Sequence, residues 1–335
     1  MTGSSIQQRS ELPRALLVAL LGIALSGAAS AQTAAWRPDK NVEIIVGTSP
    51  GGGQDTSARL VQRIIQDNKF TAVPTAVVNK PGGGSAVGYT YLNQHPGDAH
   101  FIMLLTVPLL TNHILKLSPV APSDLTPLAI VFDEYIVATV VPGSPLKSGK
   151  DLLDRLRKDP ASLSIGVPSL TGGGNFAIVL AARAAGVDPR KLKTVVFKSG
   201  GDSMTALLGG HIDVMMSTTA APILQRRSGK VRLLTVAAAR RLPGELADVP
   251  TWHENGVNVV FSNWRGIVGP RGLSAAQIAY WDGVFSRVVA TEEFKRDLEQ
   301  NYLVPNYLRS EEMRRYMAAQ YDELKVVLTE LGMVK

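Results

Sequence analysis

Short apolar runs alternate with amphipathic segments along most of the chain. The first such unit spans residues 43–64: an apolar run, a turn with three successive glycines, and then apolar positions at helical spacing. Further units of the same kind start near residues 75, 100, 163, 193 and 211. Strands that alternate with helices predict an α/β fold with largely parallel sheets.

Most of the predicted strand-to-helix turns are rich in glycine, at residues 51–53, 82–84, 172–174 and 200–201. In open α/β sheets the ligand lies beyond the carboxyl ends of the strands, where free N–H groups of helix N-termini bind anions. The turns therefore predict one cavity for a small molecule with more than one carboxylate. The alternative is that the glycines serve only the turns themselves. An added Cβ at Gly52 or Gly173 is expected to obstruct the ligand or to strain a residue with positive φ.

The glycine turns carry no complete catalytic or nucleotide-binding motif. No Lys-Ser/Thr pair follows a glycine turn at the spacing of a Walker A loop. Gly172, Gly174 and Ala177 satisfy G-x-G-x-x-A, but the next predicted strand ends in Lys198 instead of the acid that a dinucleotide needs. Ser85 lacks the flanking glycines of a nucleophile elbow, and the histidines lack metal-ligand spacing. The sequence predicts no catalytic, metal or cofactor site, which favours a binding protein over an enzyme.

Several other residues have structural interpretations. Asp55 and Arg59 stand four apart at the start of the first helix, which favours a helix-stabilising pair over a catalytic role. His95 and His100 flank a polar turn and are predicted to lie on the surface. Gly186 is predicted to end the helix that follows residues 172–174.

The N-terminal segment predicts export. Arg9 and Arg14 precede a short apolar run, and Ala29 and Ala31 form the small-x-small pattern of a signal peptidase site. Residues 1–31 are thus expected to be a cleaved signal peptide, because the run is too short for a membrane anchor. The remaining 335 − 31 = 304 residues can bury a core without disulfides, and the chain has no cysteine.

The charge of the chain is mildly basic, with a formal net charge of +7. Removal of Arg9, Arg14 and Glu11 with the signal leaves 7 − 2 + 1 = +6. The basic residues form only short, dispersed clusters on helix-like segments. They predict solvated helix faces and no nucleic-acid partner.

Five segments in order resemble the substrate-binding proteins of tripartite tricarboxylate transporters, the Bug family. They read VEIIVGTSPGGGQDTSARLVQRI, VVNKPGGGSAVGYTYL, LLGGHIDVMMS, LADVPTWHENG and NWRGIVGPRGLS. The resemblance covers essentially the whole mature chain. It departs from the family where many members read P-F-P-P-G-G and this chain reads GTSPGG.

The resemblance implies a periplasmic binding protein with two α/β lobes, joined by two crossing strands, and a ligand cleft between them. The crossings are placed near residues 131–140 and 258–266. The first lobe would comprise residues 32–137 and 258–335, and the second residues 138–257. The implied partners are a small carboxylate and large and small membrane subunits of a transporter, with the receptor expected to be a monomer. The alternative partner is a membrane sensor kinase that reads the loaded receptor.

The resemblance also implies the site residues, which lie on loops of both lobes and bind carboxylates through N–H groups, hydroxyls and waters. The first-lobe loops contribute Thr48, Ser49, Gly51, Gly52, Gly53, Asp55, Thr106 and Val107. The second-lobe loops, residues 169–175, 198–202 and 217–218, contribute Ser169, Thr171, Gly172, Gly173, Asn175, Gly200, Gly201, Asp202, Ser217 and Thr218. Arg265 follows the second crossing, where it either reaches an additional ligand carboxylate or pairs with a surface acid. Members of the family that take citrate-like acids often have a similar W-R-G sequence, which favours a di- or tricarboxylate as the ligand.

Overall fold

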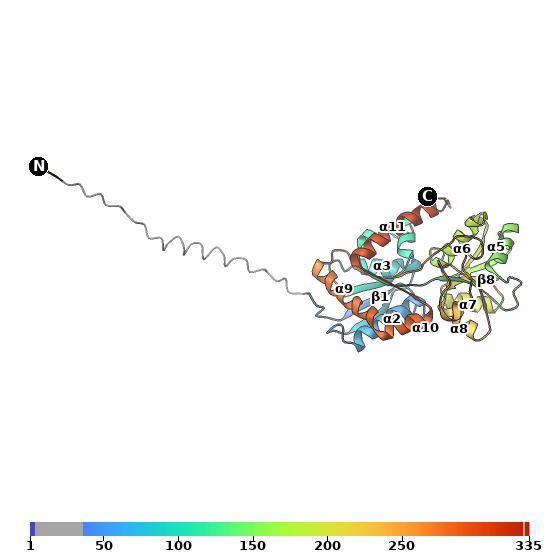
Figure 1. Cartoon of the computed structure of the whole chain (residues 1–335), viewed down its shortest axis with the longest axis horizontal. Coiled ribbons are helices and arrows are strands. Elements are labelled where there is room, and N and C mark those ends of the chain that lie inside the picture. Colours follow the sequence, from blue (N-terminus) through green and yellow to red (C-terminus); the bar gives the residue numbers. More distant parts are fainter. Residues whose placement is uncertain (4–35, 331, 335) are drawn as a thin grey trace. The chain divides into compact units, whose positions relative to one another are not determined.

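The computed structural model describes residues 1–3, 36–330 and 332–334. It divides the chain into two units, Met1–Trp36 and Arg37–Lys335, and the second unit carries the fold (Figure 1). The predicted signal peptide and its cleavage site after Ala31 lie outside the described residues. None of the helices in the described part combines the length and hydropathy that a bilayer span requires.

The first sheet has six strands in the order β11-β4-β10-β3-β1-β2. The strands β1, β2 and β3 run parallel, and β10 is antiparallel to both β3 and β4. Strand β4 therefore runs in the same direction as β1–β3, and antiparallel β11 forms the edge. Their bounds are β1 Val42–Val46, β2 Thr75–Asn79, β3 Phe101–Leu105, β4 Leu125–Asp133, β10 Arg265–Pro270 and β11 Val304–Arg309.

The second sheet repeats this plan with five strands in the order β7-β6-β8-β5-β9. The strands β6, β7 and β8 run parallel, and β5 lies antiparallel between β8 and β9. Their bounds are β5 Ile136–Val140, β6 Ser164–Val167, β7 Lys193–Val196, β8 Val214–Thr218 and β9 Arg232–Val236.

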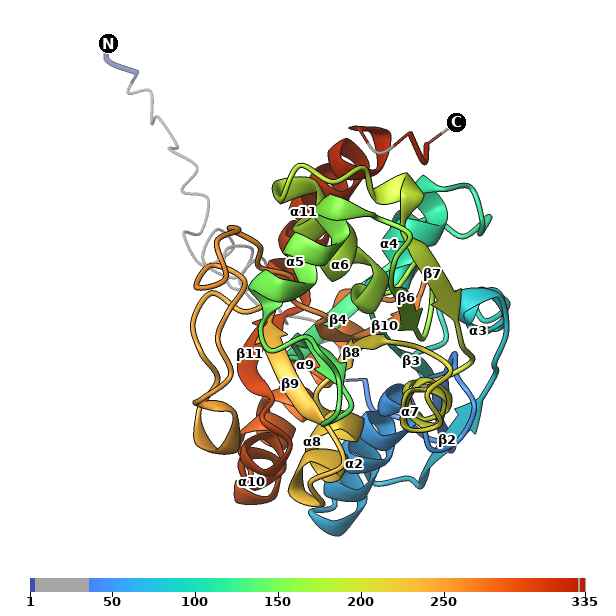
Figure 2. The ribbon, with the colours of Figure 1, turned by 90° about the vertical axis from the view of Figure 1, so that its right-hand side faces the viewer.

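Helices follow the strands and form two groups. Figure 1 shows α2, α3, α9, α10 and α11 around β1, and α5–α8 around β8. Figure 2 shows α5 and α6 on one side of the second-sheet strands and α7 and α8 on the other. Their bounds are α2 Gly53–Asp67, α3 Ala86–Asn93, α4 Pro108–Ile114, α5 Gly149–Lys158, α6 Gly173–Ala184, α7 Gly200–Leu208, α8 Ala220–Arg227, α9 Ala275–Ala290, α10 Glu292–Asn301 and α11 Ser310–Glu330. The short 3-10 turns are η1 Gly83–Ser85, η2 Pro122–Asp124, η3 Pro189–Lys191 and η4 Gly244–Leu246.

Two short crossings join the sheets. The first runs from the end of β4 to the start of β5, whose Ile136 is paired with Thr218 at the end of β8. The second brings the chain from the region after β9 to Arg265, which pairs with Phe132 near the end of β4. The crossings also pair with each other, through the Tyr135–Ser262 bridge and the backbone bond from Asn263 N–H to Glu134 C=O, at 2.8 Å.

The predicted fold class, two α/β lobes joined by two crossing strands, is confirmed by these sheets and their connections. The changes of sheet fall between residues 133 and 136 and before residue 265, inside the two predicted crossing regions. The lobe boundaries themselves, at residues 137 and 258, stay a prediction. Gly186 has a φ of 76° directly after the C-cap of α6, as predicted.

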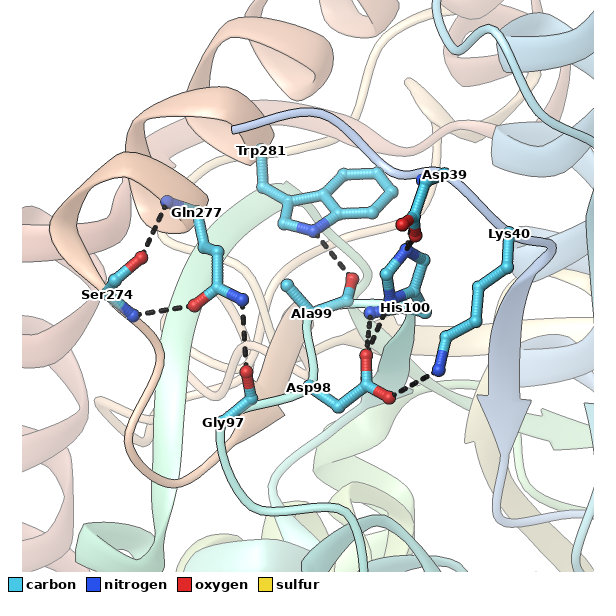
Figure 3. Close-up of polar contacts among 9 residues, drawn as sticks. All are labelled: Asp39, Lys40, Gly97, Asp98, Ala99, His100, Ser274, Gln277 and Trp281. Carbon is cyan, nitrogen blue, oxygen red and sulfur yellow. Dashed lines mark hydrogen bonds and ion pairs between the residues drawn. The ribbon is translucent and has the colours of Figure 1, made fainter. Parts of the chain in front are cut away.

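A network of polar side chains lies at the start of β3, at the edge of the first sheet that is opposite to the carboxyl ends of its parallel strands (Figure 3). His100 lies between two acids: its Nδ1 is 2.6 Å from Asp98 Oδ1, and its Nε2 is 3.0 Å from Asp39 Oδ1. Lys40 Nζ contacts the other oxygen of Asp98 at 2.9 Å. The predicted surface position is thus wrong for His100, which is buried, because acids on both sides satisfy its ring nitrogens. His95 is half-buried and stacks on Phe101.

Because of this network, the free energy of unfolding depends on pH in the acid range. Burial raises the pKa of Asp98, but hydrogen bonds from Lys40 and His100 outweigh burial and lower it to about 2 from an ordinary value of 3.8. The stability that Asp98 adds is therefore complete above its ordinary pKa and is lost as the pH falls towards 2.

We predict that Asp98→Asn is destabilising at pH 5, and that the difference from the wild type shrinks below about pH 4. Urea unfolding at a series of pH values measures this difference. Asp39→Asn, which removes the exposed acid on the other imidazole nitrogen, is the control and should change the profile less. A difference that stayed constant down to pH 3 would contradict the assignment.

Candidate ligand site

The predicted site loops lie at the carboxyl edges of the two sheets. In the first sheet, residues 47–53 follow β1 and Thr106 and Val107 follow β3, while Arg265 starts the antiparallel β10 beside them. In the second sheet, residues 168–172 follow β6, residues 197–199 follow β7, and Ser217 and Thr218 end β8. Both crossings leave one sheet and enter the other at the carboxyl ends of the parallel strands. The helices α2, α6, α7 and α8 therefore all begin at the edges that the crossings join.

The first loop is held by a single buried carboxylate. Asp55 Oδ2 accepts hydrogen bonds from Gly51 N–H and Arg59 Nε, both at 2.9 Å, and its Oδ1 accepts one from Asn79 at 3.0 Å. Asn79 also donates to Thr48 C=O at 2.9 Å, so both ends of the loop are fixed. Burial raises the pKa of Asp55, but the hydrogen bonds from Arg59, Gly51 and Asn79 prevail and lower it.

The predicted pair of Asp55 with Arg59 is therefore confirmed, and the contacts of Asp55 show how it acts. Its carboxylate holds the glycine loop in place and is charged at neutral pH. A carboxylate occupied in this way fixes the backbone of the loop and is not available as a base.

Two further polar contacts join the first-lobe loops. Gln54 Nε2 donates to Thr106 Oγ1 at 3.3 Å, which links the start of α2 to the end of β3. Ser85 Oγ donates to Gly47 C=O at 3.3 Å, which links the turn after β2 to the first loop. Gln54 and Ser85 are not among the predicted site residues, although both lie next to the glycines of the predicted turns.

The turn after β2 is left-handed over four residues. Gly82, Gly83, Gly84 and Ser85 have φ values of 133°, 56°, 60° and 78°. Glycine adopts such angles freely, but a buried serine does so only where its surroundings impose them. Asn112 in α4 donates to Gly84 C=O at 2.9 Å and so supports this turn.

The second-lobe loop after β6 contacts the first lobe directly. Thr111 Oγ1 in α4 donates to Thr171 C=O at 2.8 Å, and both residues are buried. Within the loop, Ser169 Oγ accepts from Thr171 N–H at 3.2 Å, and Asn175 Nδ2 donates to Leu170 C=O at 2.8 Å. The side chain of Asn175 therefore stabilises the loop. The contact that Thr111 makes with this loop is not predicted from the sequence.

The glycines of this loop serve packing. A Cβ on Gly173 would lie 3.1 Å from Ile136 Cδ1 and from Phe261 Cε1, which belong to the two chain segments beside the crossings. On Gly174 it would lie 2.3 Å from Met216 C=O. The expectation of positive φ is wrong for Gly173 and for Gly52, whose φ is −77°. Close approach of α6 to the crossings is the physical reason for glycine at Gly173.

The other second-lobe loops are more open. Ser199 caps α7 by accepting from Asp202 N–H at 3.1 Å, while the Cβ position of Gly200 has no neighbour within 4 Å. Ser217 is buried and donates to Thr218 C=O at 3.0 Å. The adjacent Thr219 Oγ1 donates to Asn301 C=O of the first lobe at 3.2 Å, a second polar contact between the lobes.

Arg265 pairs with a buried acid. Its Nη2 lies 2.5 Å from Glu134 Oε2, and both side chains are almost inaccessible to solvent. Of the two predicted roles, pairing with an acid is the one seen, but the acid lies in the first crossing and not on the surface. The guanidinium Nε donates to Ser57 Oγ of α2 at 3.4 Å, and Nη1 is buried without a partner among the described residues.

Two cavities lie on another part of the molecule. One of about 360 Å³ is lined by Leu180, Arg183 and the segment 258–260, and one of about 250 Å³ lies between α6, residues 260–262 and α11. None of the predicted loop residues lines them. Within the described residues, no group of three or more His, Cys, Asp or Glu side chains is placed to hold a metal ion.

The two α/β sheets and the two crossings that join them form the fold of the periplasmic binding proteins. A family model described as "Tripartite tricarboxylate transporter family receptor" matches residues 58–333, and the chain belongs to this family. The resemblance noted in the sequence is thereby confirmed. Members of this family are solute-binding proteins and not enzymes, in agreement with the prediction.

Individual relatives are distant but match over nearly the whole chain. Protein BugT of Bordetella pertussis is 24% identical over 325 residues, which cover 94% of this chain and 97% of that protein. The structure of the periplasmic binding protein BugD is 22% identical, with a TM-score of 0.80, and covers 89% of this chain and 99% of BugD. The structure of Rpa4515 from R. palustris with adipate is 21% identical, with a TM-score of 0.80, and covers 88% and 98% of the two chains.

The packing of Gly173 leads to a prediction on stability. We predict that Gly173→Val lowers the free energy of unfolding by about 1–3 kcal/mol, because the new side chain must displace Ile136 and Phe261. The matched control is Gly200→Val, at the first residue of α7, where the Cβ position is open and the change should stay within about 0.5 kcal/mol. Urea unfolding of the two variants decides, and equal effects would contradict the packing role.

Proposed function

We propose that the chain is an extracytoplasmic receptor that binds a small organic acid, a di- or tricarboxylate, between its two lobes. It delivers the acid to large and small membrane subunits of a tripartite transporter. The periplasm is the proposed location, in line with the signal-like N-terminus and with BugD as a periplasmic relative.

One observation carries this proposal: the helix N-termini of both lobes start at the two carboxyl edges that the crossings join. Each N-terminus carries free N–H groups and a partial positive charge of roughly half a unit, so one carboxylate can bind on each lobe. Hydrogen bonds to a charged carboxylate contribute roughly 1.5–3 kcal/mol each, so backbone donors suffice for tight binding. The adipate in the Rpa4515 structure supports a ligand of this class.

We predict that carboxylates raise the melting temperature of the mature protein by several degrees at saturation. A ligand at a hundred times its Kd adds roughly 2.7 kcal/mol to the stability of the folded state. A thermal-shift screen should cover succinate, glutarate, adipate, malate, glutamate, citrate and tricarballylate, with succinamide as the uncharged counterpart of succinate. Stabilisation by neutral compounds alone would contradict the proposal.

Binding between two lobes also requires the lobes to move. We predict that saturating ligand reduces the radius of gyration measured by small-angle scattering, because a ligand held from both sides enters an open form and is then enclosed. The same data give the mass in solution, for which we expect a monomer. An unchanged radius at saturation would show that the two lobes keep a fixed distance.

A further inference from the structure

The pair formed by Glu134 and Arg265 lies where the two crossings meet the first ligand loop. Glu134 belongs to the first crossing, and its carbonyl accepts from Asn263 of the second. Arg265 ends the second crossing and starts β10. A Cβ on Gly53, the first residue of α2, would lie 3.1 Å from Arg265 Nη2, so the guanidinium lies against the helix N-terminus.

Three buried polar atoms around this N-terminus have no hydrogen-bond partner in the part of the chain that is described. They are Arg265 Nη1, Thr48 Oγ1 and Gln54 Oε1. Thr48 Oγ1 is 3.5 Å from the Cβ position of Gly52, and Gln54 is the second residue of α2, so these two side chains and the Arg265 guanidinium lie around the start of that helix. Buried polar atoms are almost always bonded, so their concentration here marks the place of a ligand's polar group.

The charges at this place cancel. Among the lysines and arginines of the described residues, Arg265 is the buried one. Its full positive charge is matched by Glu134 at 2.5 Å, and the charge of Asp55 is matched by Arg59. What attracts an anion at this place is then the partial charge of the helix N-terminus, which is roughly half a unit.

We propose that Glu134 is a specificity-determining residue: by neutralising Arg265 it makes the site select a dicarboxylate over a tricarboxylate. This inference rests on the proposed function, which leaves both classes open. Arg265 retains N–H donors at Nη1 but adds no net charge, so a third carboxylate would be buried without a counter-charge, which is costly. If Glu134 lost its charge, the positive charge of Arg265 would be available to pair with this third carboxylate.

Glutarate and tricarballylate test this directly, because they differ by one carboxylate on the central carbon. Calorimetric titration of the mature protein at pH 8 gives the ratio of their dissociation constants. We expect the wild type to bind glutarate more tightly. In Glu134→Gln, which keeps the shape of the side chain, the ratio should shift by tenfold or more towards tricarballylate. A residue with a merely structural role would weaken both acids alike.

Two further variants make the result decisive. Asp133→Asn removes the neighbouring negative charge, which is bonded to Asn306 at 3.0 Å and not to Arg265, and should shift the ratio less than threefold. The double variant Glu134→Gln/Arg265→Met leaves no ion unpaired: both acids should bind more weakly because the Nη1 donor is lost, but the ratio of their dissociation constants should return to within threefold of the wild type. It also serves if the single variant proves too unstable, since a tenfold shift in it would overturn the inference.

The outcomes separate the two proposals. If the wild type binds no carboxylate, the proposed function fails. If the wild type binds glutarate but folded Glu134→Gln keeps the same ratio, or if the wild type prefers tricarballylate, only the role of Glu134 is wrong.

Discussion

The path of the chain between the two sheets is the constraint on which the rest of the structure depends. The chain leaves the first sheet at the end of β4 and enters the second beside the end of β8, and it returns to the end of β3. Both passages therefore connect carboxyl edges. Every helix that follows a parallel strand then starts on the side where the lobes meet, which is the arrangement in which open α/β sheets bind ligands.

The two crossings bond to each other through their backbones and also carry a buried ion pair. The pair, Glu134 and Arg265, lies between them and the first turn of α2. Breaking such a pair leaves an unpaired buried charge at considerable cost, so the pair fixes the geometry of the crossings. In our proposal the same pair limits the charge of the ligand, because it leaves backbone donors and helix N-termini as the source of attraction.

The sequence predicts the fold well because strand, glycine turn and helix are local signals that recur at regular spacing. The same signals place the predicted site loops at one edge of each sheet, since parallel strands end at one edge, and the site itself stays a prediction. It does not predict pairings between distant residues: Glu134 with Arg265, His100 with Asp39, or Gly173 with Phe261. Glu134 stands beside Asp133 in a crossing segment that is otherwise mostly apolar, and the sequence does not show which of these two acids pairs with Arg265.

The central claim is that the two carboxyl edges bind one dicarboxylate from opposite sides through their helix N-termini. A crystal structure of the mature protein grown with glutarate tests it most directly. The account predicts one carboxylate within hydrogen-bond distance of N–H groups at the start of α2, and the other at the start of α6, α7 or α8. Glutarate bound by one lobe alone, or in the cavity between α6 and α11, would contradict it.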